Sequence, residues 1–220
     1  MSKHLRRELE KINKKILSLG AMVEERARMA VQAVETRDAG IAQTIIDADW
    51  EIDAMEVEIE EECLKVLALH QPVAVDLRFL IATIKINNDL ERIGDESVNI
   101  AERVVIMAKR PPMKFVFNYA PMAEKVQTML KMSLDAMVNQ DVAQAFKVIT
   151  MDDEVDVIQT LAYDRIKEAI KVHPDRVAYL INLLLISRHL ERVADHSTNI
   201  AEEVIYLIEG EIVRHAKHED

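Results

Sequence analysis

The chain has 220 residues, of which 50% are hydrophobic and only 4% aromatic, with 11 Met, 4 Gly and 5 Pro. This length allows one large domain or two small ones around an aliphatic core, and so few Gly and Pro argue against the many turns of an all-β protein. The formal net charge of −11 argues against duplex nucleic acid as a partner, because its phosphates would be repelled.

Apolar residues recur at helical spacing along most of the chain, and prolines fall only where this spacing is interrupted. The pattern predicts six long helices, at about 5–36, 39–70, 72–109, 119–139, 142–172 and 175–215. Asp38 and Asp141 each follow a helical run and are expected to cap the next helix. Helices of about 30 residues are about 45 Å long, and short connections between them indicate antiparallel neighbours in an elongated bundle.

The second half of the chain repeats the first. Residues 19–70 match the second copy at a constant offset of 103, and from Leu80 onward the offset is 100, so the second copy is three residues shorter at the intervening turn. A turn tolerates such a change because few contacts are lost there. We therefore predict an all-α fold of two tandem, pseudo-symmetric antiparallel three-helix bundles. The predicted boundaries are 1–110 for the first bundle, 111–120 for a linker and 121–220 for the second bundle.

Acidic pairs recur at matching places in the two copies. The stretch LERIGDESVNIAERV at 90–104 returns one hundred positions on as LERVADHSTNIAEEV. On a helical wheel Asp95 lies within about 80° of Glu91, on the side away from the aliphatic residues. Asp49 and Asp53 share one face of the second predicted helix, beside its apolar stripe. Packing therefore does not require either pair.

Carboxylates from neighbouring helices on one patch would repel each other, and a bound cation would reverse the sign of that interaction. Oxygen ligands suit hard divalent ions such as Mg²⁺, Mn²⁺ or Ca²⁺, and they also accept iron. We predict one metal-binding acidic patch in each bundle. Its ligands are Asp49, Asp53, Glu91 and Asp95 in the first copy, and Asp152, Asp156, Glu191 and Asp195 in the second. The alternative is a solvated acidic face, since the chain has 39 acidic residues.

Two tandem three-helix units, each with D-x-x-x-D on its second helix and E-R-[IV]-x-D-x-S-x-N-I-A-E on its third, resemble the PhoU family of bacterial phosphate-uptake regulators. The resemblance covers nearly the whole chain. It implies a cytoplasmic, non-enzymatic and often dimeric negative regulator of the phosphate regulon. Such a protein couples the phosphate ABC transporter, through its ATPase subunit, to a membrane sensor histidine kinase, and reaches the membrane through these partners only.

The resemblance also implies that the eight acids bind metal ions or multinuclear iron clusters, with Fe, Mn, Mg and Zn as candidates. Second-tier ligands on the same helix face are Asn99, Glu102, Asn199 and Glu202. The two copies differ at Glu96/His196 and at Arg103/Glu203. These differences would allow the two patches to prefer different metals or partners.

Two alternatives stay open, a di-iron-type carboxylate enzyme and a metal-free helical scaffold. A di-iron bundle needs Glu-x-x-His pairs that point into its core, and no Glu in this chain has a His three residues on. No nucleophile constellation and no phosphate-binding glycine loop is apparent. The adaptor interpretation is therefore preferred over the enzyme.

A few single residues carry further expectations. The lone cysteine, Cys63, excludes an intrachain disulfide, fits a reducing compartment and lies on an apolar stripe, where it is expected to act as a small hydrophobe. Trp50 is expected to be half-buried, and His196 to lie at the surface. No signal peptide or stretch long enough to span a membrane is apparent, so a cytoplasmic location is expected.

Overall fold

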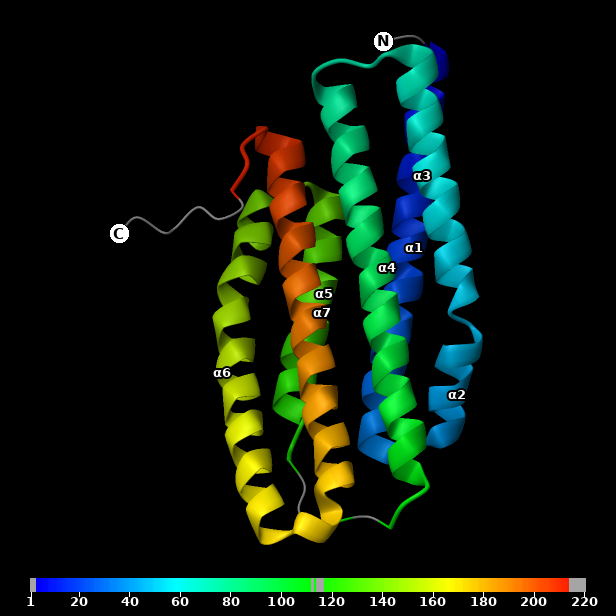
Figure 1. Ribbon diagram of the computed structural model, residues 1–220. Coiled ribbons are helices and arrows are strands. Elements are labelled where there is room, and N and C mark those ends of the chain that lie inside the picture. Colours follow the sequence, from blue (N-terminus) through cyan, green and yellow to red (C-terminus); the bar gives the residue numbers. More distant parts are fainter. Residues whose placement is uncertain (1–2, 112, 114–116, 214–220) are drawn as a thin grey trace, which may run out of the picture.

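The computed structural model describes residues 3–111, 113 and 117–213, which form an elongated bundle of helices (Figure 1). The helices are α1 (Lys3–Thr36), α2 (Ala39–Asp47), α3 (Trp50–His70), α4 (Val75–Ala108), α5 (Ala120–Asn139), α6 (Val142–Val172), the 3₁₀ turn η1 (Pro174–Arg176) and α7 (Val177–Glu209). No strand occurs among the described residues. The predicted all-α fold is confirmed.

The second predicted helix, 39–70, is two helices rather than one. The helix is interrupted at Ala48 and Asp49. Their backbone N–H groups donate to the carbonyls of Ile45 and Ile46 at 3.3 and 3.5 Å. These bonds reach back three residues instead of four, as in a tightened turn that ends an α-helix. Neither Gly nor Pro marks the break, which explains why the sequence pattern did not predict it. The matching helix of the second half, α6, is continuous.

Side-chain caps fix where two helices begin, as the sequence predicts. The carboxylate of Asp38 accepts hydrogen bonds from the backbone N–H groups of Gly40 and Ile41 at the start of α2, and Asp141 caps α6 in the same way. Such a cap stabilises a helix by about 1 kcal/mol. The end of the last predicted helix, 215, is wrong, because Gly210 takes the left-handed conformation (φ 78°) that terminates α7 after Glu209.

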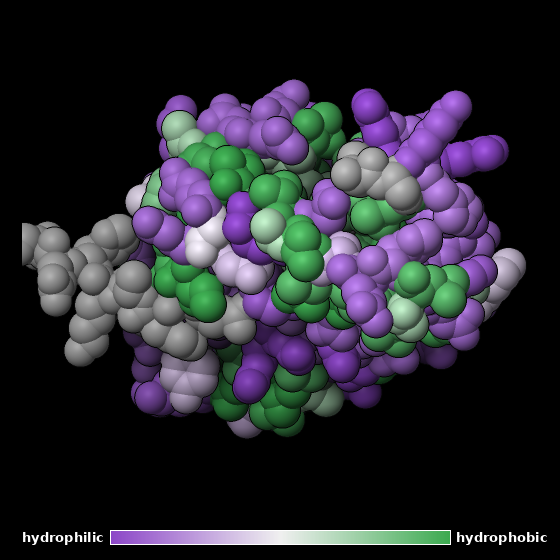
Figure 2. Space-filling view, turned by 90° about the horizontal axis from the view of Figure 1, so that it is seen from above, coloured by the Kyte–Doolittle hydropathy of each residue, from purple (hydrophilic) through white to green (hydrophobic). Residues whose placement is uncertain are grey.

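The two longest helices of the centre, α4 and α7, lie side by side and antiparallel (Figure 1). Helices α1, α2 and α3 surround α4, whereas α5 and α6 pack against α7. The core is mainly aliphatic, and its fully buried side chains include Ile16, Ile52, Ile86, Leu90 and Ile100. Each such side chain stabilises the fold by about 1.5–3 kcal/mol. Hydrophilic side chains cover much of the surface seen from above (Figure 2).

Candidate functional site

Helix α3 packs closely on α4 where Gly94 faces Ile52. A Cβ atom on Gly94 would lie only 3.1 Å from Ile52 Cδ1, so a larger residue would push the two helices apart. Asp53 follows Ile52 and Asp95 follows Gly94, and this contact therefore sets the two acid pairs on neighbouring helices. We call them the first acidic patch, which consists of Asp49, Asp53, Glu91 and Asp95.

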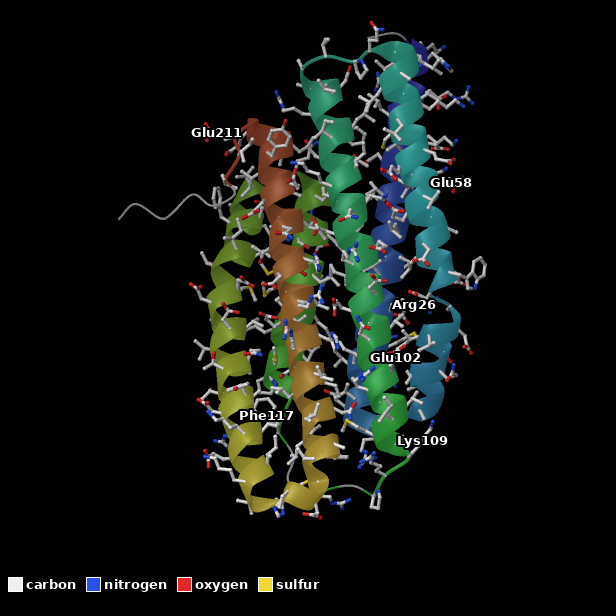
Figure 3. All side chains as sticks on the ribbon, in the orientation of Figure 1. Arg26, Glu58, Glu102, Lys109, Phe117 and Glu211 are labelled. Atoms are coloured by element: carbon white, nitrogen blue, oxygen red, sulfur yellow. The ribbon has the colours of Figure 1, made fainter. Side chains whose placement is uncertain are left out.

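The carboxylates of the first acidic patch act on one another. Burial raises the pKa of Asp49, and the charges of Asp53 and Asp95 raise it further. Burial and Asp95 likewise raise the pKa of Glu91. Arg26 of α1, which pairs with Glu51 at 2.6 Å beside the break between α2 and α3 (Figure 3), opposes the rise at Asp49. The pKa of Asp95 is raised as well, so Asp49, Glu91 and Asp95 hold their negative charge less readily than they would in water.

The second half contains an equivalent group, the second acidic patch, formed by Asp152, Asp156, Glu191 and Asp195. Burial raises the pKa of Asp152 from 3.8 to about 6, with further contributions from Asp195 and Asp156. The pKa values of Glu191 and Asp195 are raised by burial and by the neighbouring carboxylates. The structure therefore brings together, in each half, the four acids that the sequence singles out, within range of mutual repulsion.

The patches contain carboxylate oxygens that lack hydrogen-bond partners. Glu91 Oε2 and Asp152 Oδ1 are both buried without one, and the nearest cation to Glu91 Oε2 is Arg92 Nε at 3.5 Å. The hydroxyl of Thr198 faces Asp152 and opposes the rise in its pKa through a long, poorly aligned hydrogen bond, which does not satisfy Asp152 Oδ1. Within the described part of the chain, no three His, Cys, Asp or Glu side chains are arranged to hold one metal ion. The donor atoms suit a hard cation, but their present conformations do not enclose one.

A second polar feature runs between the two halves, along the contact of α4 with α7. Glu96 of α4 is only 2% exposed, and its two oxygens lie 2.6 Å from His189 Nδ1 and 2.9 Å from Arg192 Nη1 of α7. Burial alone would raise the pKa of Glu96, but the hydrogen bond to His189 and the charge of Arg192 outweigh it and lower the pKa. We call this row of contacts the seam.

Two more contacts belong to the seam. Asp89 Oδ1 lies 2.9 Å from His196 Nδ1 and accepts a hydrogen bond from Asn199 Nδ2 at 3.1 Å. Lys85 pairs with the buried Glu203 at 3.0 Å. The expectation that His196 lies at the surface is therefore wrong, because α7 presents it to α4. Two of the positions that differ between the copies, 96/196 and 103/203, therefore take part in the contact between the halves. They do so through Glu96, His196 and Glu203.

The second-tier ligands do not all lie with the patches. The side-chain amide of Asn199 is bound to Asp89 in the seam, and the amide of Asn99 helps to lower the pKa of Glu96. Glu102 is exposed and pairs with Arg103 at 2.9 Å, whereas Glu202 is half-buried. The sequence placed all four on the acidic face, but a helical wheel has no information about which neighbour each side chain reaches.

The single cysteine is buried as predicted, whereas the single tryptophan is exposed. Cys63 is fully buried, and burial raises the pKa of its thiol to about 12, which confirms it as a small hydrophobe. Trp50 is 66% exposed, so the expectation of half-burial is wrong. It begins α3 directly after the break, where the helix start turns its side chain outward from the core. No helix in the described segments has the length and apolar character needed to cross a membrane.

Comparison with known proteins finds one family whose members match both halves of the chain. The sequence profile of the PhoU domain matches residues 16–104 and 120–204, one match in each half. A phosphate-specific transport system accessory protein PhoU homolog of Aquifex aeolicus is 38% identical over 209 residues, covering 95% of both chains. A homolog of the same name from Pseudomonas aeruginosa is 36% identical over 217 residues, covering 98% of this chain and 89% of the relative.

Two solved structures are similar over nearly their whole length. The crystal structure of PhoU from Pseudomonas aeruginosa superposes with a TM-score of 0.90 at 35% identity, covering 94% of this chain and 99% of that one. The crystal structure of the phosphate transport system regulatory protein PhoU from Streptococcus pneumoniae gives a TM-score of 0.83 at 31% identity, covering 95% and 99%. The similarity thus extends through both halves and the contact between them.

Proposed function

Because the chain belongs to the PhoU family, we propose that it is an accessory protein of phosphate-specific transport. The observation that carries this proposal is the match of both halves to the PhoU domain, together with relatives of that name over 95% of the chain. The names of these relatives describe accessory and regulatory proteins, in keeping with a role other than catalysis.

In its finer form, the proposal is a cytoplasmic adaptor that keeps the phosphate regulon repressed. One outer helix face would contact the ATPase subunit of the phosphate ABC transporter, and another would contact the sensor histidine kinase. The exposed aliphatic side chains of the two outer helices support this arrangement. On α3 these include Val57 and Leu64, seven residues apart, and on α6 they include Val157 and Leu161. Apolar side chains repeated along one helix face are typical of surfaces that bind another protein.

Paired substitutions test the adaptor. Val57→Asp with Leu64→Asp should abolish capture of one partner, and Val157→Asp with Leu161→Asp should abolish capture of the other, when each variant is mixed with the purified ATPase subunit or kinase. Val138→Asp, at an exposed aliphatic position near the end of α5, is the matched control. In cells, loss of the chain should derepress a phosphate-regulon reporter in phosphate-rich medium. Unchanged capture of both partners by both variants would refute the assignment of these faces.

A self-associated form is part of the proposal, since the family resemblance implies a homodimer. Sedimentation velocity of the purified chain should then show a species of twice the 25.1 kDa chain mass. The Val57→Asp with Leu64→Asp variant would show whether the same α3 face also joins two copies. A purely monomeric boundary at all concentrations would remove the homodimer from the proposal while leaving the partner contacts testable.

We further propose that each acidic patch binds divalent metal ions. The support is the oxygen donor set, the mutual repulsion of the carboxylates, and the buried oxygens of Glu91 and Asp152 that lack hydrogen-bond partners. In the first patch the ligands would be Asp49, Asp53, Glu91 and Asp95, and in the second Asp152, Asp156, Glu191 and Asp195. A bound cation would offset the repulsion within each patch and join neighbouring helices. No three of these side chains are now arranged around one point. Metal binding would therefore require the carboxylates of a patch to turn toward a common ion.

Calorimetric titration of the purified chain with Mn²⁺, Mg²⁺, Fe²⁺ and Zn²⁺ tests this second part. Trp50 is the only Trp and follows Asp49 directly, so quenching of its fluorescence by paramagnetic Mn²⁺ reports the first patch by itself. Glu91→Gln with Asp95→Asn should abolish that quenching, and Asp152→Asn with Asp195→Asn should leave it intact. Heat signals that do not change in either variant would favour the metal-free scaffold.

A further inference from the structure

The turn that joins α3 to α4 displays several aliphatic side chains to solvent. We call residues 69–77 the tip. Its exposed aliphatic residues are Leu69 (68% exposed), Val73 (75%), Val75 (59%) and, to a lesser degree, Leu77. One exposed valine is ordinary on a protein surface. Four such side chains within nine residues, at the outer end of a long bundle (Figure 1), form an apolar cap that the fold itself does not use.

The backbone of the tip holds this cap in an unusual conformation. Gln71 and Ala74 both have positive φ angles, of 46° and 52°, although neither is glycine. Ala74, with ψ −119°, lies outside the regions that residues with a side chain normally adopt. The equivalent turn of the second half is three residues shorter and closes through η1 instead. Backbone strain of this kind persists where the surrounding structure fixes it, and it is concentrated at functional sites.

Basic side chains surround the tip. His4 and His70 meet edge to face with their ring centroids 5.3 Å apart, so the start of α1 lies beside the end of α3. Residues 3–10 and 65–78 together contain five Lys and Arg against three Asp and Glu, a net charge of +2 in a chain of net charge −11, and Arg6 pairs with Glu10. Lys3 and Arg7 are exposed, and neither forms an ion pair with another described residue.

Beyond the acids already counted, the nearest acids of α3 are Glu61 and Glu62. They precede His70 by nine and eight residues of helix, about 12–14 Å, and Glu62 is paired with Lys11 and Lys15. Asp53 of the first acidic patch precedes His70 by 17 residues of helix, which corresponds to about 25 Å. This is roughly three times the screening length of about 8 Å at physiological ionic strength. Glu211, just beyond the end of α7 (Figure 3), follows Gly210, which lies against the guanidinium of Arg78, so the charge of Arg78 is not counted toward the tip. Four Lys and Arg against three Asp and Glu remain, a net charge of +1. A negatively charged surface that approaches the tip end-on therefore meets a locally positive end.

We propose that the tip docks on an anionic membrane surface, with Val73 and Val75 entering the headgroup layer and the surrounding basic side chains facing anionic lipid. Figure 2 views the molecule from this end and shows apolar side chains at the surface among hydrophilic ones. The tip protrudes, and a fluid lipid surface can accept a protrusion without a matching groove. Basic residues next to a membrane gain from the negative potential of anionic lipid. The chain would then contact the bilayer directly, in addition to any contact through protein partners.

Cosedimentation of the full chain with vesicles tests the proposal, using phosphatidylcholine alone or mixed with phosphatidylglycerol. The wild type should bind only vesicles that contain phosphatidylglycerol, and binding should fall as added salt shortens the screening length. Val73→Asp with Val75→Asp should weaken binding by about tenfold or more. Lys3→Glu with Arg7→Glu should abolish binding to vesicles that contain phosphatidylglycerol, because the acidic side chains are repelled by anionic lipid.

The second half offers a matched control at the opposite end of the bundle, where Val172 is 71% exposed. Val172→Asp should bind vesicles as well as the wild type does. Val73→Ser with Val75→Ser provides a second tip variant without new charge, and thermal unfolding checks that every variant is folded. No binding of the wild type to phosphatidylglycerol vesicles at low salt would overturn the proposal, as would equal loss in Val172→Asp. Loss of a protein partner in the tip variants without vesicle binding by the wild type would mark the tip as a protein-docking surface and overturn it as well.

Discussion

Replacing Asp152 by Asn should stabilise the metal-free protein at neutral pH. Burial and the charges of Asp195 and Asp156 raise the pKa of Asp152 from 3.8 to about 6. Because one pKa unit is equivalent to about 1.4 kcal/mol, the charged carboxylate is disfavoured by about 3 kcal/mol at pH 7. The side chain is only half-buried, and solvent screening reduces this to about 1.5 kcal/mol. For a chain of this size that gain corresponds to a rise in Tm of about 3–6 °C.

The sign of the pH dependence follows from the direction of the shift. An acid whose pKa is higher in the folded chain than in the unfolded chain destabilises the fold once it ionises. The advantage of Asp152→Asn should therefore be complete above about pH 6 and should vanish below the unfolded pKa of 3.8, where both states hold the proton. Thermal unfolding followed by circular dichroism, in chelator and across this pH range, measures the difference.

A matched control separates this effect from a general effect of removing charge. Asp164 lies on the same helix, is exposed to solvent and is outside the acidic patch, so Asp164→Asn should change stability by less than about 0.5 kcal/mol. With Mn²⁺ added, the wild type should gain more stability than Asp152→Asn, because the variant lacks a ligand. A metal-free Asp152→Asn protein that is less stable than the wild type at neutral pH would refute the electrostatic reasoning.

Three further predictions concern the buried Glu96, the buried Cys63 and the exposed Trp50. Glu96→Gln should destabilise the fold by about 2 kcal/mol at neutral pH, since it weakens the charged contacts with His189 and Arg192. The pKa of Glu96 is lowered, so this loss should shrink as the pH falls below its usual value of 4.5, as measured by urea unfolding. Cys63 should not react with a thiol reagent until the chain unfolds, and labelling of the native protein would contradict its burial and raised pKa. Trp50 should be quenched by acrylamide nearly as well as free tryptophan but poorly by iodide, which the adjacent acids repel; a blue-shifted, protected emission would show that it is covered.

Local chemistry made much of the fold predictable from the sequence. The caps at Asp38 and Asp141 follow from residue type and position, and the apolar spacing gave most helix boundaries within a few residues. The break at Ala48 was not predictable, because it contains no Gly or Pro and depends on how α2 and α3 pack against α4. The two acidic patches could be expected because packing does not explain why the acid pairs repeat, whereas the conformations of their carboxylates do not follow from residue spacing.

The seam could not be found by comparing the two copies, and the reason lies in its geometry. Helices α4 and α7 are equivalent in sequence and antiparallel in space, so the contact of Asp89 with His196 and the contact of Glu96 with His189 are images of each other. Position 89 corresponds to 189 and position 96 to 196. If both copies kept the acids of the first, carboxylates would face carboxylates at both contacts, within the interface of α4 with α7. Histidine at 189 and 196 removes that repulsion and supplies a hydrogen-bond partner for each acid. The differences at 89/189 and 96/196 are therefore ones that the pairing of the two halves requires, while the acidic patches, which lie outside that contact, were free to remain alike.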